Sequence, residues 1–540
     1  MKRLWKLKFL VGVWQITLLI ITTLIQLLTA DIARILLLPS VPQKSTWMPN
    51  LGKELIKQDY EVYAVVRKEW AHAIAYQNNG MKLITYQINI SSDITLEKYE
   101  EKWSKFINSV TKEATTSYID AQIYLLRTRS GADILAGDGE SLLKNNQFWE
   151  RVKQLKFNLA VIEGNLLTPY LYIIPYKLGI PFVSSAATWD EYRMRLPFLP
   201  SFSPAPLLPL TDEMTFPQRL KNFVFAILSP QIETSSFISS DNLLKKYASE
   251  KPAISTRDLQ RISKLWIVDA APPVEYPRIT LSNIVITGGL TIETPQLLDS
   301  SLEGWIRGSD SDIVIVRTES FAYSEIPDNI HQLFITAFYD IPDRVIYVSK
   351  DEVKTNIPKN VKVVADESLS TLLSINEVKL FVSSCSTSAL YESVFHGVPL
   401  ICIPLFGEQH YNSRKVQAKG YGMVMEMYSF KSKQLTESIQ AVISTPQYKE
   451  NILRASAILK TEPLLPIEKA AFWVDHVIQY GADHLNSRAT DLPWYSLYSV
   501  DVAAFFFLMV LLAATVCVVT TYRLTCRVYR FFELDKDKIE

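Results

Sequence analysis

The sequence predicts an α/β protein of two halves, held in a membrane by one helix near its C-terminus. Short runs rich in β-branched residues alternate with amphipathic stretches, which is typical of parallel sheets with crossover helices. A largely apolar run of 21 residues, 502–522, is long enough to cross a bilayer as a helix. The roughly 470 residues between this run and an apolar stretch near the N-terminus are enough for two domains.

The residues that flank the run 502–522 predict its orientation. Aromatic side chains suited to a membrane interface precede it, and basic side chains follow it. The positive-inside bias therefore places the tail 523–540 in the cytoplasm and the preceding bulk of the chain in the lumen. The residues concerned are Trp494, Tyr495 and Tyr498 before the run, and Arg523, Arg527, Arg530, Lys536 and Lys538 after it.

The two ends of the chain carry targeting patterns. Four basic residues precede the apolar stretch 9–30, so we expect residues 1–30 to be a signal sequence. An uncleaved signal anchor is the alternative, because Leu28 is large for the −3 position of a cleavage site. Lys536 and Lys538 match the dilysine address that returns membrane proteins to the endoplasmic reticulum, although an ordinary charged tail would look the same.

Composition excludes several classes of function. The chain has 56 basic and 56 acidic residues, so it has no net positive charge that would attract nucleic acid. Only Cys385 and Cys402 of the four cysteines lie on the lumenal side, which predicts neither a disulfide scaffold nor a metal site. We therefore expect no metal and no bound cofactor. Asn89 begins the sequon Asn-Ile-Ser and is the expected glycosylation site.

The predicted elements divide the lumenal part into a first half at 31–285 and a second half at 290–500. Ligands of open parallel sheets bind where strands end and helices begin, so the loops after the strands are the candidate sites. In the first half we expect strands at 34–38, 60–66, 158–162 and 181–184, and a helix at 47–57. In the second half we expect strands at 313–316, 344–348, 361–364, 379–383, 400–404 and 422–425, and helices at 328–338, 386–395, 408–419 and 434–444.

The most specific motif is the stretch 381–412. It contains Glu392, His-Gly-Val-Pro at 396–399, Pro-Leu-Phe-Gly at 404–407, Gln409 and Asn412, all in one register over 32 positions. This stretch resembles the donor-site signature of the UDP-glycosyltransferases, the family of the glucuronosyltransferases. Gly-Gly-Leu at 288–290, Asp501 and the basic tail are also similar to that family.

The resemblance implies two facing Rossmann-like domains of the GT-B type, with the acceptor in the first and the UDP-sugar in the second. It implies a single-pass type I protein of the endoplasmic reticulum membrane. The implied reaction moves glucuronate or a hexose to a small lipophilic hydroxyl compound, with the UDP-sugar as co-substrate. A base removes the hydroxyl proton, and backbone N–H groups at a helix start stabilise the departing diphosphate.

The same resemblance assigns donor-binding roles. Glu392 corresponds to the acid that holds the ribose hydroxyls. An ionised carboxylate suits this role because it only accepts hydrogen bonds, which the two hydroxyls can donate. Glu408 and Gln409 take the positions that contact the sugar hydroxyls, and Glu408 is one methylene longer than the family's Asp. The phosphate loop is the run Ser384, Cys385 and Ser386, followed by Ser388, where the family has His-Gly-Gly. Cys385 as a reactive nucleophile is a minor alternative.

Three further positions depart from the family's pattern. Lys44 replaces the family's catalytic His, and Glu163 stands for the Asp that pairs with it, so we expect a Lys44–Glu163 salt bridge there. No aromatic residue lies between positions 361 and 380, where the family stacks the uracil. Glu319 falls in the turn near the diphosphate, where its charge is repulsive unless Arg317 offsets it.

Two functions remain open after these departures. The first is a working UDP-glycosyltransferase in which Glu163 or Lys44 assists proton removal. The second is a degenerate, non-catalytic relative that acts as a binding or regulatory subunit and associates with its own copies or with active relatives. The spanning helix disfavours a third, a secreted carbohydrate binder.

Overall fold

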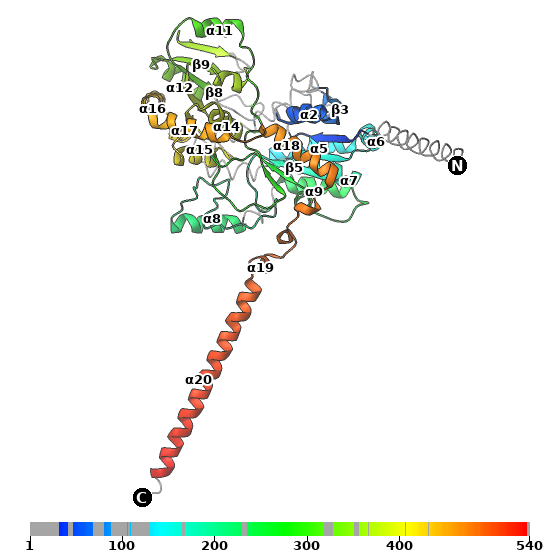
Figure 1. Ribbon diagram of the computed structural model, residues 1–540, viewed down its shortest axis with the longest axis vertical. Coiled ribbons are helices and arrows are strands. Elements are labelled where there is room, and N and C mark those ends of the chain that lie inside the picture. The colour runs from blue at the N-terminus through cyan, green and yellow to red at the C-terminus, as the bar shows by residue number, and fades with distance from the viewer. Residues whose placement is uncertain are drawn as a thin grey trace, which may run out of the picture.

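The computed structural model describes residues 32–40, 47–68, 80–87, 105, 109, 129–164, 168–228, 235–317, 328–349, 356–364, 367–405, 407–429 and 431–536. Within these residues the chain forms two parallel sheets covered by helices, with one long helix that leaves the globular body (Figure 1). The predicted α/β class with two Rossmann-like domains is confirmed.

The first sheet has seven strands in the order β3-β2-β1-β4-β5-β6-β7, and every neighbouring pair is parallel. Its central strand β1 is the apolar run Arg-Ile-Leu-Leu-Leu, whose four apolar side chains are all buried because helices cover both faces. The strands are β1 (Arg34–Leu38), β2 (Glu61–Arg67), β3 (Lys82–Tyr86), β4 (Leu159–Glu163), β5 (Phe182–Ala186), β6 (Trp266–Val268) and β7 (Ile284–Ile286).

The second sheet has six parallel strands in the order β10-β9-β8-β11-β12-β13. The sequence predicts all six, two of them with the observed ends and the other four within two residues. The strands are β8 (Ile313–Arg317), β9 (Arg344–Val348), β10 (Val361–Val364), β11 (Val378–Ser383), β12 (Leu400–Cys402) and β13 (Gly422–Val424).

Helices follow most of the strands in both domains. Those of the first are α2 (Trp47–Lys57), α5 (Arg129–Lys144), α6 (Asn146–Leu155), α7 (Ile173–Leu178), α8 (Phe216–Leu228), α9 (Ser235–Tyr247) and α10 (Thr256–Arg261). Those of the second are α11 (Ser300–Arg307), α12 (Asp328–Tyr339), α13 (Leu369–Leu373), α14 (Thr387–His396), α15 (Gln409–Ala418), α16 (Ser432–Ser444) and α17 (Pro446–Leu459).

The strand orders place a topological switch point in each sheet. The chain changes direction between β1 and β4 in the first sheet and between β8 and β11 in the second. Loops leave the sheet in opposite directions at such a point, which opens a crevice at the carboxyl ends of the strands. Glu163 ends β4 at the first switch point, and the run 384–386 follows β11 at the second.

The last helix of the globular body returns to the first domain. Helix α18 (Pro466–Tyr480) packs on α2, and Ala470, Ala471 and Val474 are buried in the core under β1. The Tyr60 hydroxyl donates to the Asp475 carboxylate and ties α18 to the start of β2. The first domain therefore includes a C-terminal segment that a linear division at residues 290–500 places in the second half.

Residues 269–283 connect β6 to β7 and also reach the second domain. Ala271 and Val274 join the core of the second domain, while the Glu275 carboxylate accepts from the Lys415 ammonium group on α15. A short loop of the first sheet thus holds both domains together.

Helix α20 (Val500–Lys536) contains the predicted run 502–522 and extends away from the body (Figure 1). Its segment Val500–Arg530 is the one helix in the described part of the chain that has the length and hydropathy to cross a membrane. The short helix α19 (Trp494–Leu497) precedes it.

Candidate functional site

The loop between β11 and α14 forms the centre of the candidate site. Helix α14 begins at Thr387, and the Ser386 side chain caps it by accepting from the Ala389 N–H at 3.2 Å. The Ser388 hydroxyl lies 3.1 Å from the Ser386 hydroxyl. Because the first N–H groups of a helix lack partners within it, the start of a helix is a natural place for a phosphate.

Cys385 takes part in this loop through its backbone, while its side chain points into the core. Its φ of 59° lies in the left-handed region, which glycine adopts most easily. Its side chain forms a disulfide with Cys402 at the end of β12, with a Cα–Cα distance of 5.3 Å. The minor alternative of a reactive Cys385 thiol is therefore wrong, because the sulfur is already bonded and fully buried.

The disulfide was not predicted, because only the structure shows that the two cysteines lie at the ends of neighbouring strands. The expected strands 379–383 and 400–404 are neighbours in the sheet, and Ser383 pairs in register with Cys402. Two cysteines at the same end of adjacent strands can reach each other. The bridge also fits the lumenal placement that the sequence predicts for this part of the chain, because disulfides persist in oxidising compartments.

Glu392 is buried on α14 and is held by two side chains. The Ser370 hydroxyl donates to its carboxylate at 2.5 Å, and His396 Nε2 lies 3.1 Å from the Ser370 oxygen. Since the single Ser370 proton goes to Glu392, His396 must donate its Nε2 proton to Ser370. Burial lowers the pKa of His396 to about 4, so the ring is neutral at physiological pH.

Ser370 is a residue that the sequence reading missed. It belongs to the short helix α13, in the segment where the uracil-stacking motif of the family was expected. No pattern marked it, because its role depends on the contact between α13 and α14. The predicted end of α14 is confirmed, since Gly397 closes the helix in the left-handed conformation with a φ of 67°.

Gln409 and Asn412 hold the loops at the site through buried amides. The Gln409 side-chain oxygen accepts from the Leu405 N–H at 2.8 Å. The Asn412 amide donates to the Cys385 carbonyl at 3.1 Å and to the Thr387 hydroxyl at 3.2 Å, which joins α15 to the loop between β11 and α14. Glu408 stands immediately before α15, as its N-cap residue.

The two domains meet at the start of α14. The Thr387 hydroxyl donates to the Ala187 carbonyl at 3.4 Å, and Ala187 directly follows β5 of the first sheet. The carboxyl ends of both sheets therefore face each other at the loop that carries the candidate donor residues.

Glu163 lies at the end of β4 and anchors the chain after β1. One carboxylate oxygen accepts from the Ser40 N–H and hydroxyl, both at 2.8 Å, and the other accepts from the Trp47 indole N–H at 2.8 Å. Sequence reasoning missed Ser40 and Trp47 as partners. Lys44 lies outside the described residues, so the expected Lys44–Glu163 salt bridge stays a prediction.

Several other predicted residues also lie outside the described part of the chain. They are Glu319, Asn89 and Lys538, and the roles assigned to them stay predictions. Lys536 is the last described residue of α20, and its role as part of a retrieval address is likewise untested.

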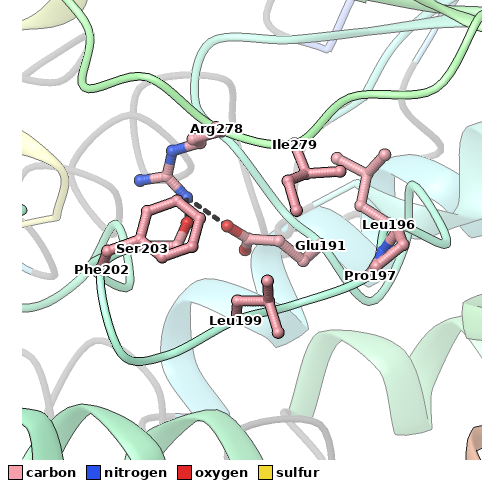
Figure 2. A pocket seen from close by; sticks show the side chains of 8 residues that line it. All are labelled: Glu191, Leu196, Pro197, Leu199, Phe202, Ser203, Arg278 and Ile279. Carbon is pink, nitrogen blue, oxygen red and sulfur yellow. Dashed lines mark hydrogen bonds and ion pairs between the residues drawn. The ribbon is translucent and has the colours of Figure 1, made fainter. Parts of the chain in front are cut away.

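A small cavity that is partly open to solvent lies in the first domain, close to α15 (Figure 2). The Arg278 guanidinium group forms an ion pair with the Glu191 carboxylate inside it and donates to the Ser203 hydroxyl at 3.1 Å. Arg278 also donates to the Tyr411 hydroxyl on α15 at 2.7 Å. The apolar walls come from Leu196, Pro197, Leu199, Phe202 and Ile279. No motif indicated this cavity.

Comparison with known proteins agrees with this geometry. Residues 33–537 match the family described as "UDP-glucoronosyl and UDP-glucosyl transferase". UDP-glucuronosyltransferase 2A1 of Mus musculus is 28% identical over 372 residues, which cover 68% of this chain and 70% of the relative. UDP-glucuronosyltransferase 2B17 of Homo sapiens is 24% identical over 489 residues, which cover 89% of this chain and 90% of the relative.

Solved structures share the two-domain fold. The glycotransferase of kitacinnamycin superimposes with a TM-score of 0.57 at 14% identity, covering 83% of this chain and all of that one. The structure of UDP-glucose: anthocyanidin 3-O-glucosyltransferase in complex with UDP superimposes with a TM-score of 0.54 at 13% identity. The match covers 83% of this chain and 99% of that one. At these identities the likeness shows the GT-B fold alone, while the family match spans nearly the whole chain. This chain belongs to the family of UDP-glucuronosyl and UDP-glucosyl transferases.

Proposed function

We propose that this protein is a membrane-anchored glycosyltransferase. It moves glucuronate or a hexose from a UDP-sugar to a small lipophilic hydroxyl compound on the lumenal side of the endoplasmic reticulum membrane. The observation that carries the proposal is the meeting of the two domains at the start of α14, where Thr387 contacts Ala187. A donor bound at that helix start would present its sugar to an acceptor held by the first domain.

The donor site uses groups whose chemistry suits a UDP-sugar. The start of α14 offers backbone N–H groups to the diphosphate, and they need no reorganisation as charge develops on the leaving group. Glu392 supplies a carboxylate acceptor for the ribose hydroxyls, and Ser370 and His396 hold it in place. Glu408 and Gln409 supply polar groups for the sugar hydroxyls at the adjacent loop.

The acceptor proton must leave through a group other than a histidine at the family position, since Lys44 stands there. Lys44 or Glu163 would take this role in the proposed enzyme. A lysine acts as a base only if its pKa falls several units below about 10.4. Removal of the acceptor proton is therefore the step that this chain must perform differently from the pattern of its family.

A second candidate function is a non-catalytic subunit that keeps the fold and pairs with another family member. The hydrogen bonds of Glu163 to Ser40 and Trp47 favour it, because they engage both carboxylate oxygens in holding the backbone together. A carboxylate used in this way is a structural anchor, and a base would have to be found elsewhere.

Thermal unfolding of the full-length protein in detergent, titrated with UDP and several UDP-sugars, separates these functions. A ligand at 100 times its dissociation constant adds about 2.7 kcal/mol to the free energy of unfolding. We expect UDP to stabilise the wild type and Glu392→Ala to lose most of that gain. Glu437→Ala is the matched control, because Glu437 is an exposed carboxylate on another helix, α16.

Product analysis completes the test. Incubation with each UDP-sugar and a panel of phenols and alcohols, followed by mass spectrometry, should give a glycosylated product. Stabilisation by UDP without any product would select the non-catalytic function. The absence of stabilisation at millimolar UDP would remove the enzyme and leave only the subunit role.

A further inference from the structure

Helix α8 exposes an apolar face. With 3.6 residues per turn, its large apolar side chains fall on one side of the helix, and each of these residues is at least 45% exposed. A helix on a water-facing surface places such residues toward the core. An exposed apolar patch of this kind marks an interaction site. The residues of this face are Phe216, Leu220, Phe223, Val224, Ile227 and Leu228.

The opposite side of α8 is held to the body by a polar residue. Asn222 is fully buried, and its amide donates to the Pro200 carbonyl at 2.9 Å and to the Ser203 carbonyl at 2.8 Å. Its side-chain oxygen accepts from the Ala205 N–H at 2.9 Å. These three bonds fix the rotation of the helix about its own axis, so the apolar face is directed outward by a specific contact.

The loop that holds α8 is also tied to the approach to the spanning helix. The Tyr498 hydroxyl accepts from the Phe198 N–H at 2.8 Å and lies 3.0 Å from the Phe198 carbonyl. Arg195 lies 3.9 Å from Asp491, just before α19. Figure 1 shows α8 and α19 at the same end of the globular body, the end from which α20 leaves. Helix α8 is therefore on the side of the molecule that meets the membrane.

The chemistry around the apolar face fits a lipid surface. Trp494, Tyr495 and Tyr498 are all at least 42% exposed near the start of α20, where an interfacial aromatic belt lies. On α8 itself, Arg219 and Lys221 lie at the two edges of the apolar face. Long basic side chains at such edges reach lipid headgroups while their stems cover apolar surface.

We propose that α8 is an interfacial helix that lies on the same leaflet from which α20 enters the bilayer. Its apolar face would sit at the boundary between headgroups and acyl chains, a depth of about 5–10 Å. Together with α20 it gives the body two attachments to the membrane, which set the orientation of the first domain. This proposal stands apart from the catalytic function and holds for an enzyme or a non-catalytic subunit.

Spin-label accessibility in lipid nanodiscs tests the proposal on the full chain. The two free cysteines are removed as Cys517→Ser and Cys526→Ser, which leaves the Cys385–Cys402 bridge intact. A nitroxide is then attached at Leu220→Cys or, one turn further on, at Phe223→Cys. The matched control is Ile458→Cys on α17 of the second domain, where the native residue is 48% exposed against 53% for Leu220.

The measured quantity is the ratio of collision rates with oxygen, which concentrates in lipid, and with a water-soluble nickel chelate. In discs that hold one protein chain, we expect this ratio to be severalfold higher at positions 220 and 223 than at 458. Equal ratios at all three positions would overturn the proposal. Protection of 220 and 223 that arises only in discs with two chains would overturn it as well, and would assign the face to a second copy.

Discussion

Burial keeps the His396 ring neutral, and its remaining N–H group donates a hydrogen bond to Ser370, the partner of Glu392. Its side chain is 9% exposed, and desolvation lowers its pKa from 6.5 to about 4. The neutral ring donates to Ser370, which donates to Glu392. A residue that closes a helix therefore also orients the carboxylate expected to bind the ribose.

The shifted pKa of His396 predicts acid sensitivity. The folded state disfavours protonation, so the stabilising contribution is present above pH 6.5 and is lost as the pH falls towards 4. At pH 5 this loss amounts to about 2 kcal/mol relative to pH 7.5. We expect the free energy of unfolding, measured by urea titration in detergent, to fall less over this range in His396→Gln than in the wild type.

The Gln variant keeps a donor near the Nε2 position and removes the titration, so it isolates this histidine from His410, whose pKa burial also lowers to about 4. Parallel pH profiles for the two proteins would contradict the assignment of His396 as a buried neutral ring.

Among single residues, the sequence could place the motif positions but not their partners. Glu392, Gln409 and Asn412 stand in one continuous stretch, and its resemblance to the family's signature located them. Ser370 precedes Glu392 by 22 positions on another helix, and Trp47 precedes Glu163 by 116. Contacts over such separations depend on the packing of the elements, which no local pattern encodes.

The candidate donor site depends on one unit, which consists of β11, the following loop, α14 and β12. The disulfide between Cys385 and Cys402 closes it, while Asn412 fastens its loop to α15. The strands and helix of this unit were predicted from their patterns, since buried parallel strands are continuous apolar runs. The bridge was missed because four scattered cysteines are no disulfide pattern by themselves.

Removal of the bridge should reveal two separate effects. The double variant Cys385→Ser with Cys402→Ser opens a link across 17 residues and should lose about 3 kcal/mol of stability. The double variant Cys385→Gly with Cys402→Ser should recover about 1 kcal/mol of this loss, because position 385 has a φ of 59°. Urea unfolding of both variants in detergent measures the difference.

Equal stability of the two double variants would show that the left-handed conformation of Cys385 does not persist without the bridge. A wild type that is insensitive to a reducing agent under unfolding conditions would argue against the bridge itself.

In the whole molecule, a buried charged network joins the two domains. Burial opposes ionisation of Glu275, but Lys415 and Arg278 outweigh it and hold the pKa of this carboxyl below its usual range. The Tyr411 hydroxyl accepts from Arg278 at 2.7 Å and lies 3.2 Å from the Glu275 carboxylate. This network therefore helps to set how the first domain sits against the second.

Removal of Lys415 alone should lower the free energy of unfolding more than removal of the charges of both Lys415 and Glu275. Lys415→Met leaves the Glu275 carboxylate buried without its main counter-charge, which should lower the free energy of unfolding by about 3–5 kcal/mol. The double variant Glu275→Gln with Lys415→Met removes the buried charge as well, so we expect part of the stability to return. Urea unfolding of the three proteins in detergent gives the comparison.

Lys433→Met serves as the control, since Lys433 forms an exposed pair with Glu437 on α16 and such pairs contribute little. A double variant that is no more stable than Lys415→Met would exclude a buried unpaired carboxylate as the cause.

The sequence by itself determined the α/β class, the second sheet and the C-terminal helix, because local periodicity and composition encode all three. It also carried the donor-type motif, which its resemblance to a known family identified. Only the tertiary structure decided which side chains hold Glu163 and Glu392, that Cys385 is bonded to Cys402, and that α18 returns to the first domain. It also decided that Asn222 on α8 faces inward. Each of these depends on packing between segments far apart in the chain, where burial and hydrogen bonding select partners that sequence patterns do not mark.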